Sequence, residues 1–319
     1  MSRKIAVVVL TWNNHEYTLD CLRSLAEQTL PHTVYVVDNA STDGTPEIVA
    51  ARFPNARVIV NDTNLGFAGG NNVGMQAAFA DGADAVLVLN NDTTLVPDVL
   101  ALLTDTRGIH PDAGIISPAI LYAQPPHKIW FAGANLNTWM GWSYHAHHNA
   151  PYESLRRQVR RIARTTGCAM LITHECYTAI GGYDDDFFMY YEDVEYSLHA
   201  RRAGFETYLV PDAVVYHHVS ASFGEVKPGN AVYYGVRNGM VTMDRHYPLP
   251  FPLSLARHVT IVVGMIYYVV KPPSAPARVR DIFSGYRDAQ RRWLGPRHAR
   301  YRTAKFHPVR DPQPSPAPH

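Results

Sequence analysis

Polar side chains with carboxylate and amide oxygens follow each of four short apolar runs in the first half of the chain. After the successive runs they are Thr11, Asn13 and Asn14; Asp38, Asn39, Ser41 and Asp43; Asn61, Asp62 and Asn64; and Asn90, Asn91 and Asp92. Such oxygens bind hard divalent cations and accept hydrogen bonds from polar ligands. Asn and Asp also favour turns for backbone reasons alone, but four polar loops at equivalent places indicate a binding site.

Two adjacent carboxylates, Glu192 and Asp193, begin a segment with helical spacing in the second half of the chain, and Gly204 occupies the position typical of the end of that helix. One interpretation is that the two acids only stabilise the first turn, by about 0.3–1 kcal/mol each. The other is that they act on a ligand. Neighbouring residues of a regular helix point in different directions, so both cannot face the same atom.

The apolar runs that must position these groups are predicted to be buried β-strands, at Ile5–Leu10, Val34–Val37, Val58–Val60 and Ala85–Leu89. They are apolar almost throughout, which is typical of strands covered on both faces. Segments with helical spacing separate them, so the alternation predicts an α/β protein with a parallel, doubly wound sheet. In such sheets ligands bind outside the carboxyl ends of the strands, where the polar residues follow.

Three helices are predicted between these strands. The first has its apolar residues on one face, at Tyr17, Leu22, Leu25 and Leu30. The second runs from Pro46 to Phe53 with Thr45 as its N-cap, and the third covers Val73 to Phe79. The chain contains no G-x-x-x-x-G-K-[ST] loop, and Gly66, Gly69 and Gly70 do not form a G-x-G-x-x-G turn, which removes the main support for a P-loop or a dinucleotide site.

Length and composition describe a globular chain with a basic end. With 319 residues the chain is too long for a small protein held together by disulfides, and 46% hydrophobic with 18% charged residues excludes a wholly disordered chain. Three cysteines (Cys21, Cys168 and Cys176) are too few for a disulfide framework, and the run Ile5–Leu10 is too short for a secretory signal, so we expect a reducing, cytoplasmic location. Residues 271–319 hold 11 Lys and Arg against 3 Asp and Glu, a net charge of +8, which leaves −7 for residues 1–270.

The C-terminal part allows two interpretations. Val259–Val270 is an apolar run of 12 residues, below the roughly 18 needed to span a bilayer. With the basic segment after it, this run suits peripheral attachment to an anionic membrane surface. Alternatively, the run packs on the rest of the protein and the end of the chain, with prolines at positions 308, 312, 314, 316 and 318, is a disordered tail.

Four motifs occur in the order found in one known family: the run from Val36 to Thr45, the run from Asn64 to Asn71, Leu89 to Thr93, and the Glu192–Asp193 pair. Together they resemble the family 2 glycosyltransferases, most closely the rhamnosyltransferase-like bacterial members, over residues 4 to 245. The resemblance implies the GT-A fold, a Rossmann-like, mostly parallel sheet flanked by helices. It also implies a nucleotide-activated sugar donor, Mg²⁺ or Mn²⁺, and inversion at the anomeric carbon.

The same resemblance implies a division of the chain. Residues 1–250 would form the catalytic domain, with a donor half of about 1–115 and an acceptor half of about 116–250. Residues 251–319 would form a C-terminal helical extension that ends in the Pro-rich tail.

The resemblance also assigns roles to acids and to one histidine. Asp193 matches the catalytic aspartate that takes a proton from the acceptor hydroxyl, Glu192 supports it, and Glu195 is the fallback. Asp92 matches the last acid of the metal-binding D-x-D motif, but Asn90 stands where many members have the first acid. Metal binding without the donor should therefore be weak. His217 fits the spacing of a family histidine that ligates the metal or contacts the diphosphate, better than His218 does.

Donor contacts are expected at the strand ends. Asp38 matches the family position that accepts a hydrogen bond from the nucleotide base, although an Asx turn is the alternative. The other expected contacts are Thr11, Asn13, Asn64, Gly66, Gly70 and Asn91. For the glycines the alternative is a glycine-rich turn that leads into the following helix.

Two further clusters are assigned less specific roles. His145, His147 and His148 lie among Trp139, Trp142 and Tyr144. No second cluster completes a four-ligand zinc site, so this loop is predicted to be part of the acceptor wall. The arginines at positions 156, 157, 160, 161 and 164 are interpreted as the solvated face of a helix, or as contacts to a phosphate.

The predicted function is metal-dependent, inverting transfer of a sugar from a UDP- or dTDP-sugar, dTDP-rhamnose included, to a hydroxyl of a glycan or glycolipid during cell-surface polysaccharide synthesis. A sugar nucleotidyltransferase is disfavoured because residues 11–16 hold no glycine-rich loop with Lys or Arg, and a non-catalytic binding module because both Asp92 and Asp193 are present. No nucleic-acid-binding motif accompanies the basic tail. The sequence indicates no oligomeric state.

Overall fold

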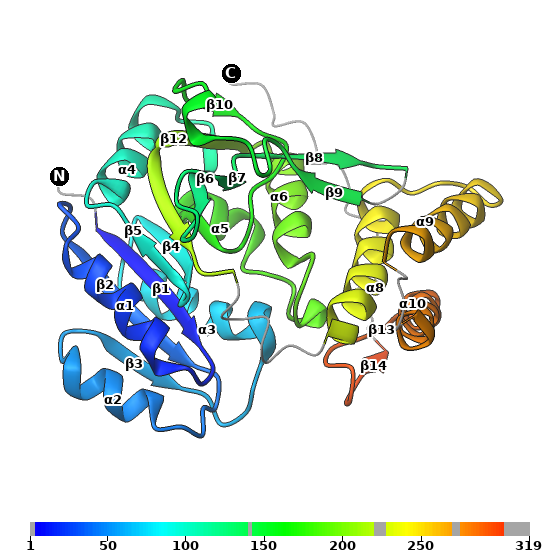
Figure 1. Cartoon of the computed structure of the whole chain (residues 1–319), viewed down its shortest axis with the longest axis horizontal. Coiled ribbons are helices and arrows are strands. Elements are labelled where there is room, and N and C mark those ends of the chain that lie inside the picture. Colours follow the sequence, from blue (N-terminus) through cyan, green and yellow to red (C-terminus); the bar gives the residue numbers. More distant parts are fainter. Residues whose placement is uncertain (1–3, 140–141, 220–227, 270–274, 303–319) are drawn as a thin grey trace, which may run out of the picture.

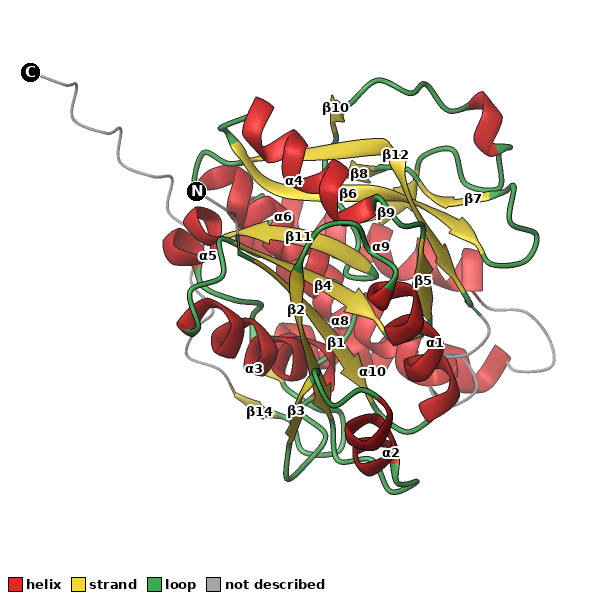
Figure 2. Ribbon diagram, turned by 90° about the vertical axis from the view of Figure 1, so that its left-hand side faces the viewer, coloured by secondary structure: helices red, strands yellow, loops and turns green. Residues whose placement is uncertain are grey.

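Ten strands form one large sheet in the computed structural model, which describes residues 4–139, 142–219, 228–269 and 275–302. Figures 1 and 2 show this sheet running through the middle of the molecule. Four parallel strands form one half, and their bounds are β1 Ile5–Thr11, β2 His32–Asp38, β3 Arg57–Val60 and β4 Ala85–Asn90. All four predicted strands are therefore confirmed.

The other half of the sheet departs from the purely parallel pattern. β11 (Ala169–Thr173) lies antiparallel between β4 and β6 (Ala113–Tyr122), and β12 (Glu206–His217) is parallel to β6. Short antiparallel strands pair with this half, namely β5 Thr93–Leu95, β7 Ile129–Phe131 and β10 Arg160–Arg161. The sheet is therefore mostly parallel by strand direction, with β11 as an antiparallel insertion.

Helices cover both faces of the sheet because successive strand residues point to opposite sides. Val7 and Val9 belong to one apolar core together with α1 (His15–Ala26), α2 (Thr45–Arg52) and α4 (Val99–Ile109). Ala6 and Val8 belong to the core on the other side, which is completed by α3 (Gly66–Ala80), α5 (His174–Ile180) and α6 (Glu192–Arg202). This is the doubly wound arrangement that the sequence predicts.

Several boundaries differ from the prediction. β3 is an edge strand, and Val60 is 57% exposed because no strand covers its outer side. α1 ends at Ala26, before Leu30, and α2 begins at Thr45 with Gly44 as its N-cap. α3 begins at Gly66, seven residues before the predicted start, so Gly69 and Gly70 lie in a helix and not in a turn.

The arginine-rich stretch at 156–164 is not a helix, and that interpretation is wrong. It consists of irregular chain and the two-residue strand β10, which pairs with β12. Its side chains point to different neighbours. Arg157 pairs with Asp212 and Arg161 with Asp112, whereas Arg164 is buried.

In the described part of the chain after the sheet, three helices gather at one end of the molecule, as Figure 1 shows. They are α8 Pro228–His246, α9 Leu253–Val269 and α10 Ala275–Gln290, and α8 packs against α6, α9 and α10. Two small hairpins complete the described chain, formed by β8 Ala134–Asn137 with β9 Trp142–His145 and by β13 Trp293–Leu294 with β14 Tyr301–Arg302. Among the described residues, no helix combines the length and apolarity needed to cross a membrane. The Pro-rich tail of residues 303–319 lies outside them.

Candidate active site

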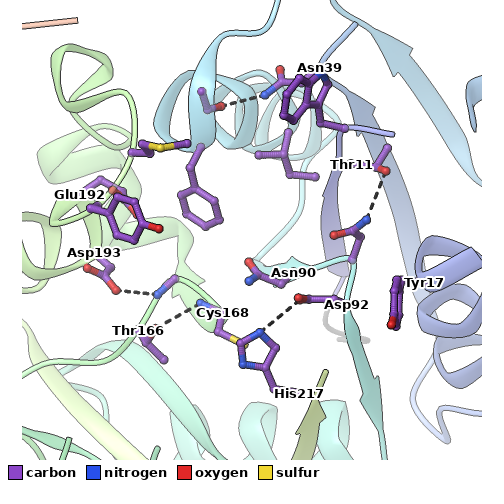
Figure 3. A pocket seen from close by; sticks show the side chains of 18 of the residues that line it. Thr11, Tyr17, Asn39, Asn90, Asp92, Thr166, Cys168, Glu192, Asp193 and His217 are labelled. Carbon is purple, nitrogen blue, oxygen red and sulfur yellow. Dashed lines mark hydrogen bonds and ion pairs between the residues drawn. The ribbon is translucent and has the colours of Figure 1, made fainter. Parts of the chain in front are cut away.

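A cavity of about 360 Å³ opens at the carboxyl edge of the parallel strands. Figure 3 shows side chains from distant parts of the chain meeting there: Thr11 and Tyr17 on one side, Glu192 and Asp193 on the other, and Asp92, Cys168 and His217 between them. This is the edge at which a doubly wound sheet binds its ligands. The fold thus brings both predicted acidic groups to one cavity, although about a hundred residues separate them in the sequence.

Asp92 and His217 form a buried pair at the base of this cavity. The short strand β5, directly after Asp92, pairs with the end of β12, and this pairing brings His217 Nε2 to 3.3 Å from Asp92 Oδ1. Burial lowers the pKa of His217, but the neighbouring Cys168 and Asp92 raise it above its ordinary value, so the ring is protonated at neutral pH. His218 turns the other way and contacts the ring of Tyr17. Of the two histidines, His217 therefore faces the acid.

The pair fits a single hard cation. One or two carboxylates commonly suffice for Mg²⁺, because substrate phosphates and water complete its shell, and imidazole also binds transition metals such as Mn²⁺ once the metal displaces its proton. In the described part of the chain no three His, Cys, Asp or Glu side chains are grouped so that they could hold a metal ion. The remaining ligands would therefore have to come from a bound substrate. Cys168 lies beside the pair; burial raises the pKa of its thiol and the neighbouring His217 lowers it, with a raised pKa as the result.

Asp193 is held at the first turn of α6 by backbone donors. Its Oδ2 accepts a hydrogen bond from Gly167 N at 3.0 Å, and its Oδ1 accepts one from Val194 N at 2.7 Å. The guanidinium of Arg164, only 4% exposed, lies 3.9 Å from the same carboxylate and compensates its charge. These contacts fix the Asp193 side chain at the cavity wall, where it can accept a proton from a bound hydroxyl.

Glu192 also lines the cavity, but its environment differs from that of Asp193. It is 6% exposed, and its Oε2 has no hydrogen-bond partner among the described residues. Burial and the charge of Asp193 raise the pKa of Glu192 well above its ordinary value. Burial and the neighbouring negative charge thus favour the protonated form of Glu192, which gives two adjacent carboxyl groups different chemistry.

Glu195, the fallback base, is not at the cavity. Its carboxylate binds Arg245 Nη1 at 2.9 Å and His246 Nε2 at 3.2 Å, both on α8. Burial alone would raise the pKa of Glu195, but the hydrogen bond from His246 and the charge of Arg245 lower it to about 2. Glu195 therefore joins α6 to α8, and its geometry offers no access to an acceptor.

Four of the expected donor contacts line the cavity, namely Thr11, Asn64, Gly66 and Asn91. Gly66 has a left-handed backbone (φ +74°), and a β-carbon there would collide with the carbonyl of Phe188. Asn64 Oδ1 accepts a hydrogen bond from Gly66 N at 2.8 Å, which fixes the start of α3 at the cavity rim. The first turns of α3 thus occupy the segment for which the sequence analysis offered a glycine-rich turn.

The other three expected donor contacts, Asn13, Asp38 and Gly70, are not among the described residues that line the cavity. Asp38 Oδ1 accepts a hydrogen bond from Ser41 N at 2.8 Å, as in the alternative turn interpretation, while its Oδ2 is buried without a hydrogen-bond partner in the described chain. Asn13 Oδ1 accepts a hydrogen bond from Thr42 N. Gly70 lets α3 pack closely on β1, because a β-carbon would lie 2.5 Å from Leu10.

Aromatic rings that the sequence analysis did not single out form part of the wall: Trp12, Tyr17, Trp130 and Tyr190. The ring of Trp130 lies edge-on to His217, with 4.5 Å between centroids, and His145 packs on Trp130 from another side. Burial lowers the pKa of His145 to about 4, so this ring is neutral at pH 7. His145 therefore supports a wall residue, and Trp12, which directly follows Thr11, was the sequence signal that could have revealed the aromatic wall.

The loop before Glu192 has an unusual backbone. Phe188, Tyr190 and Tyr191 have φ angles of 64°, 64° and 71°, a region that bulky residues adopt only at an energetic cost and only when surrounding contacts impose it. Here Asn238 of α8 supplies those contacts. Its buried Nδ2 donates to the carbonyls of residues 187, 189 and 190 at 3.1, 2.9 and 2.7 Å.

The neighbouring Arg237 completes this anchor. It is fully buried and donates to Phe187 O at 3.0 Å and to Gly295 O at 2.7 Å. Arg237 and Asn238 of α8 are thus distant in sequence from the loop before Glu192, yet they impose the loop conformation that places Glu192 and Asp193. Neither belongs to a recognisable motif, so no sequence pattern pointed to them.

We expect Asn238→Leu, which keeps the branched shape of the side chain but removes all three hydrogen bonds, to lower kcat by about ten- to a hundredfold, because a misplacement of about 1 Å has an effect of that size. Steady-state kinetics with thermal unfolding would measure it. The control is Asn55→Leu in an exposed turn. A variant with lower thermal stability but unchanged kcat would show that Asn238 supports only the fold.

A family model described as glycosyltransferase-like family 2 matches residues 2–229. Among curated proteins, the chain is 27% identical over 266 residues to an N-acetylglucosaminyl-diphospho-decaprenol L-rhamnosyltransferase of Mycobacterium tuberculosis, covering 77% of this chain and 86% of that protein. It is 21% identical over 278 residues to the dTDP-rhamnosyl transferase RfbF of Shigella flexneri, covering 83% and 90% of the two chains.

Solved structures share the fold at low sequence identity. GalNAc-T7 with UDP, GalNAc and Mn²⁺ has a TM-score of 0.62 at 14% identity, over 90% of this chain and 55% of that one. Residues 1–349 of Staphylococcus aureus TarS have a TM-score of 0.56 at 19% identity, over 90% and 80% of the two chains. These neighbours have the GT-A fold, and the family model covers the whole cavity-forming sheet. The chain therefore belongs to glycosyltransferase family 2, as a rhamnosyltransferase-like member with the GT-A fold.

Proposed function

We propose that this protein transfers a sugar, with inversion, from a nucleoside-diphosphate donor to a hydroxyl group of a glycan or glycolipid. The observation that carries the proposal is that the Asp193 carboxylate and the Asp92–His217 pair face one cavity from different elements of the fold, as Figure 3 shows. Transfer requires two such groups. One takes the proton of the attacking hydroxyl, and the other binds the departing diphosphate.

In this mechanism Asp193 accepts the proton as the acceptor oxygen forms its bond to the anomeric carbon and the bond to the diphosphate breaks. Gly167 N and Arg164 hold the carboxylate in place for this step. Asp92 and His217 would hold Mg²⁺ or Mn²⁺, which as a Lewis acid would stabilise the negative charge on the leaving diphosphate. Attack from the side opposite to the diphosphate inverts the anomeric carbon.

The charge of the cavity supports the need for a divalent cation. Of the described residues that line it, none is Lys or Arg, whereas Asp92 and Asp193 are acidic. A diphosphate entering such a cavity would meet two carboxylates, with His217 as the nearby cation on the lining and the buried Arg164 behind Asp193. Structural neighbours that hold Mn²⁺ together with UDP or GDP-Man support the same requirement.

The donor and acceptor classes follow from the relatives and from the wall of the cavity. Two relatives are named rhamnosyltransferases, one of them for dTDP-rhamnose, so dTDP-rhamnose is the proposed donor. The name of the mycobacterial relative includes a lipid-linked acceptor, and rings such as Trp12 and Tyr190 offer faces on which sugars stack. We therefore propose a lipid-linked acceptor in cell-surface polysaccharide synthesis, at the cytoplasmic face of the membrane.

Transfer assays with UDP-, dTDP- and GDP-sugars test this function, each with Mn²⁺ or Mg²⁺ and an N-acetylglucosaminyl-diphospho-lipid acceptor. We expect product from dTDP-rhamnose, with the opposite anomeric configuration by NMR, and none in EDTA. Formation of a nucleotide sugar from a nucleoside triphosphate and a sugar phosphate would instead identify a nucleotidyltransferase. Donor binding without turnover on any acceptor would favour a binding module.

A further inference from the structure

The helix α9 exposes a continuous apolar stripe. Leu255, Val259, Val263 and Tyr267 recur every four residues and are 42%, 52%, 59% and 89% exposed. Residues four apart lie above one another on a helix, so these side chains form one row. Phe251, four residues before Leu255, is 80% exposed and extends the row beyond the start of the helix.

The opposite side of α9 is already used for packing. Ile261 is buried in the core that α9 shares with α8 and α10, and the buried Arg257 and His258 both bind Asp244 of α8. A surface helix of a globular protein is normally polar on the side that faces away from the core. α9 is apolar on both sides, and contiguous exposed apolar surface of this kind marks an interaction site.

The exposed charges on α10, the helix that packs against α9, have one sign. This helix presents Arg280 and Arg287 seven residues apart on one exposed face, and the exposed Arg291 follows directly. The acidic residues described between 253 and 302 are Asp281 and Asp288, which are 5% and 0% exposed. Asp281 pairs with Arg297, and Asp288 pairs with both Arg300 and Arg287, so Arg280 and Arg291 are the exposed arginines of this group without an acidic partner among the ion pairs of the described chain. The carboxylates of this region are therefore neutralised inside the fold, while arginines remain at its surface.

We propose that the α9 stripe and the α10 arginines together form a docking surface for an anionic lipid membrane. An amphipathic helix lies in the membrane interface with its apolar side among the acyl chains, and cations beside it attract anionic headgroups. A second copy of the chain fits less well, because a two-fold contact would place two sets of the same arginines in one interface. The proposal rests on the proposed function only in that the lipid-linked acceptor would come from the membrane bound at this surface.

This surface is joined rigidly to the active site. β13, which follows α10, leads directly into Gly295, whose N donates to Asp186 O at 2.7 Å and whose carbonyl accepts from Arg237. Asp186 directly precedes the loop that places Glu192 and Asp193. A membrane bound at α9 and α10 would therefore hold the catalytic cavity at a fixed position relative to the lipid surface.

Vesicle co-sedimentation of the full-length protein, without donor or acceptor, tests the proposal. The probes are phosphatidylcholine vesicles with and without phosphatidylglycerol, at low and high salt. We expect binding only with phosphatidylglycerol, weakening as salt rises. Val259→Ser with Val263→Ser should weaken it about tenfold, and Arg280→Gln with Arg291→Gln by about fivefold for each arginine removed.

Matched control substitutions lie at the far edge of the sheet. Val60→Ser removes an equally exposed valine from β3, and Arg52→Gln removes an exposed arginine from α2. Both should bind vesicles like the unchanged protein. Equal losses in the controls and in the α9 and α10 variants would overturn the assigned surface.

Two other results would overturn the proposal. One is a full-length protein that stays in the supernatant with phosphatidylglycerol vesicles at low salt. The other is a dimer in sedimentation equilibrium that becomes a monomer in the Val259→Ser, Val263→Ser variant without any vesicle binding, which would assign the stripe to a second copy. Because transfer to a short-chain, water-soluble acceptor does not need the membrane, that assay separates a failure here from a failure of the proposed function.

Discussion

Replacing Asp193 by Asn should lower sugar transfer by about 10²- to 10⁴-fold, the usual contribution of a general base. Donor affinity should stay close to that of the unchanged protein, because this carboxylate faces the acceptor and not the nucleotide. Asn keeps the volume of the side chain and one oxygen that can accept the hydrogen bond from Gly167 N, so the local fold should persist. Single-turnover transfer and calorimetric donor binding together measure the effect.

Two comparisons sharpen this test. Asp105→Asn, on the exposed face of α4, makes the same chemical change away from the cavity and should leave transfer unchanged. Glu192→Gln should cost less than Asp193→Asn, because burial favours the neutral form of the Glu192 carboxyl group, which Gln resembles. Activity of Asp193→Asn above about a hundredth of the normal rate would exclude Asp193 as the base. An equal or greater loss in Glu192→Gln would reverse the roles of the two residues.

The local signals in the sequence located the sheet and the acids well. Strands such as Ile5–Thr11 and Ala85–Asn90 are apolar because both faces are covered, and that pattern needs no knowledge of the rest of the fold. The polar residues after them reach one edge because parallel strands end together. Asp92 and His217 meet at the cavity for this reason, whereas Asp193 reaches it from the first turn of α6, and assigning the three roles also needed the family resemblance.

The sequence failed where contacts between distant residues decide the structure. α3 begins at Gly66 in spite of its glycines, because Asn39 Nδ2 binds Gly66 O and the carbonyl of Phe188 accepts from Ala68 N. Arg164 is buried beside Asp193, whereas the arginines at positions 156, 157 and 161 are exposed. Asn238 holds the loop at Tyr190, 48 residues earlier in the chain. Such partners are set by tertiary packing, which no local pattern encodes.

Replacing Asp92 by Asn should weaken binding of a dTDP-sugar about ten- to a hundredfold in the presence of Mn²⁺, and change it little in EDTA. Loss of a group that supports a metal site typically lowers metal affinity or activity by this factor. The reason is charge: the amide would keep the volume and hydrogen-bonding capacity of the side chain but would carry no negative charge toward a divalent cation. Calorimetric titration with and without EDTA measures the difference. An equal loss in both conditions would mean that Asp92 supports the fold or touches the nucleotide directly.

The control lies at the other end of the same strand. Asp84, just before β4 at the opposite edge of the sheet, accepts a hydrogen bond from Lys4 N, and Asp84→Asn should bind the donor normally. His217→Gln is the second substitution to be measured, because the His217 ring lies 3.3 Å from the Asp92 carboxylate. If both side chains act through one bound cation, the loss in the double variant should be smaller than the sum of the two single losses, since the second change removes a ligand from a site already impaired. Strictly additive losses would show that Asp92 and His217 contribute to donor binding independently, and the shared metal site would then be wrong.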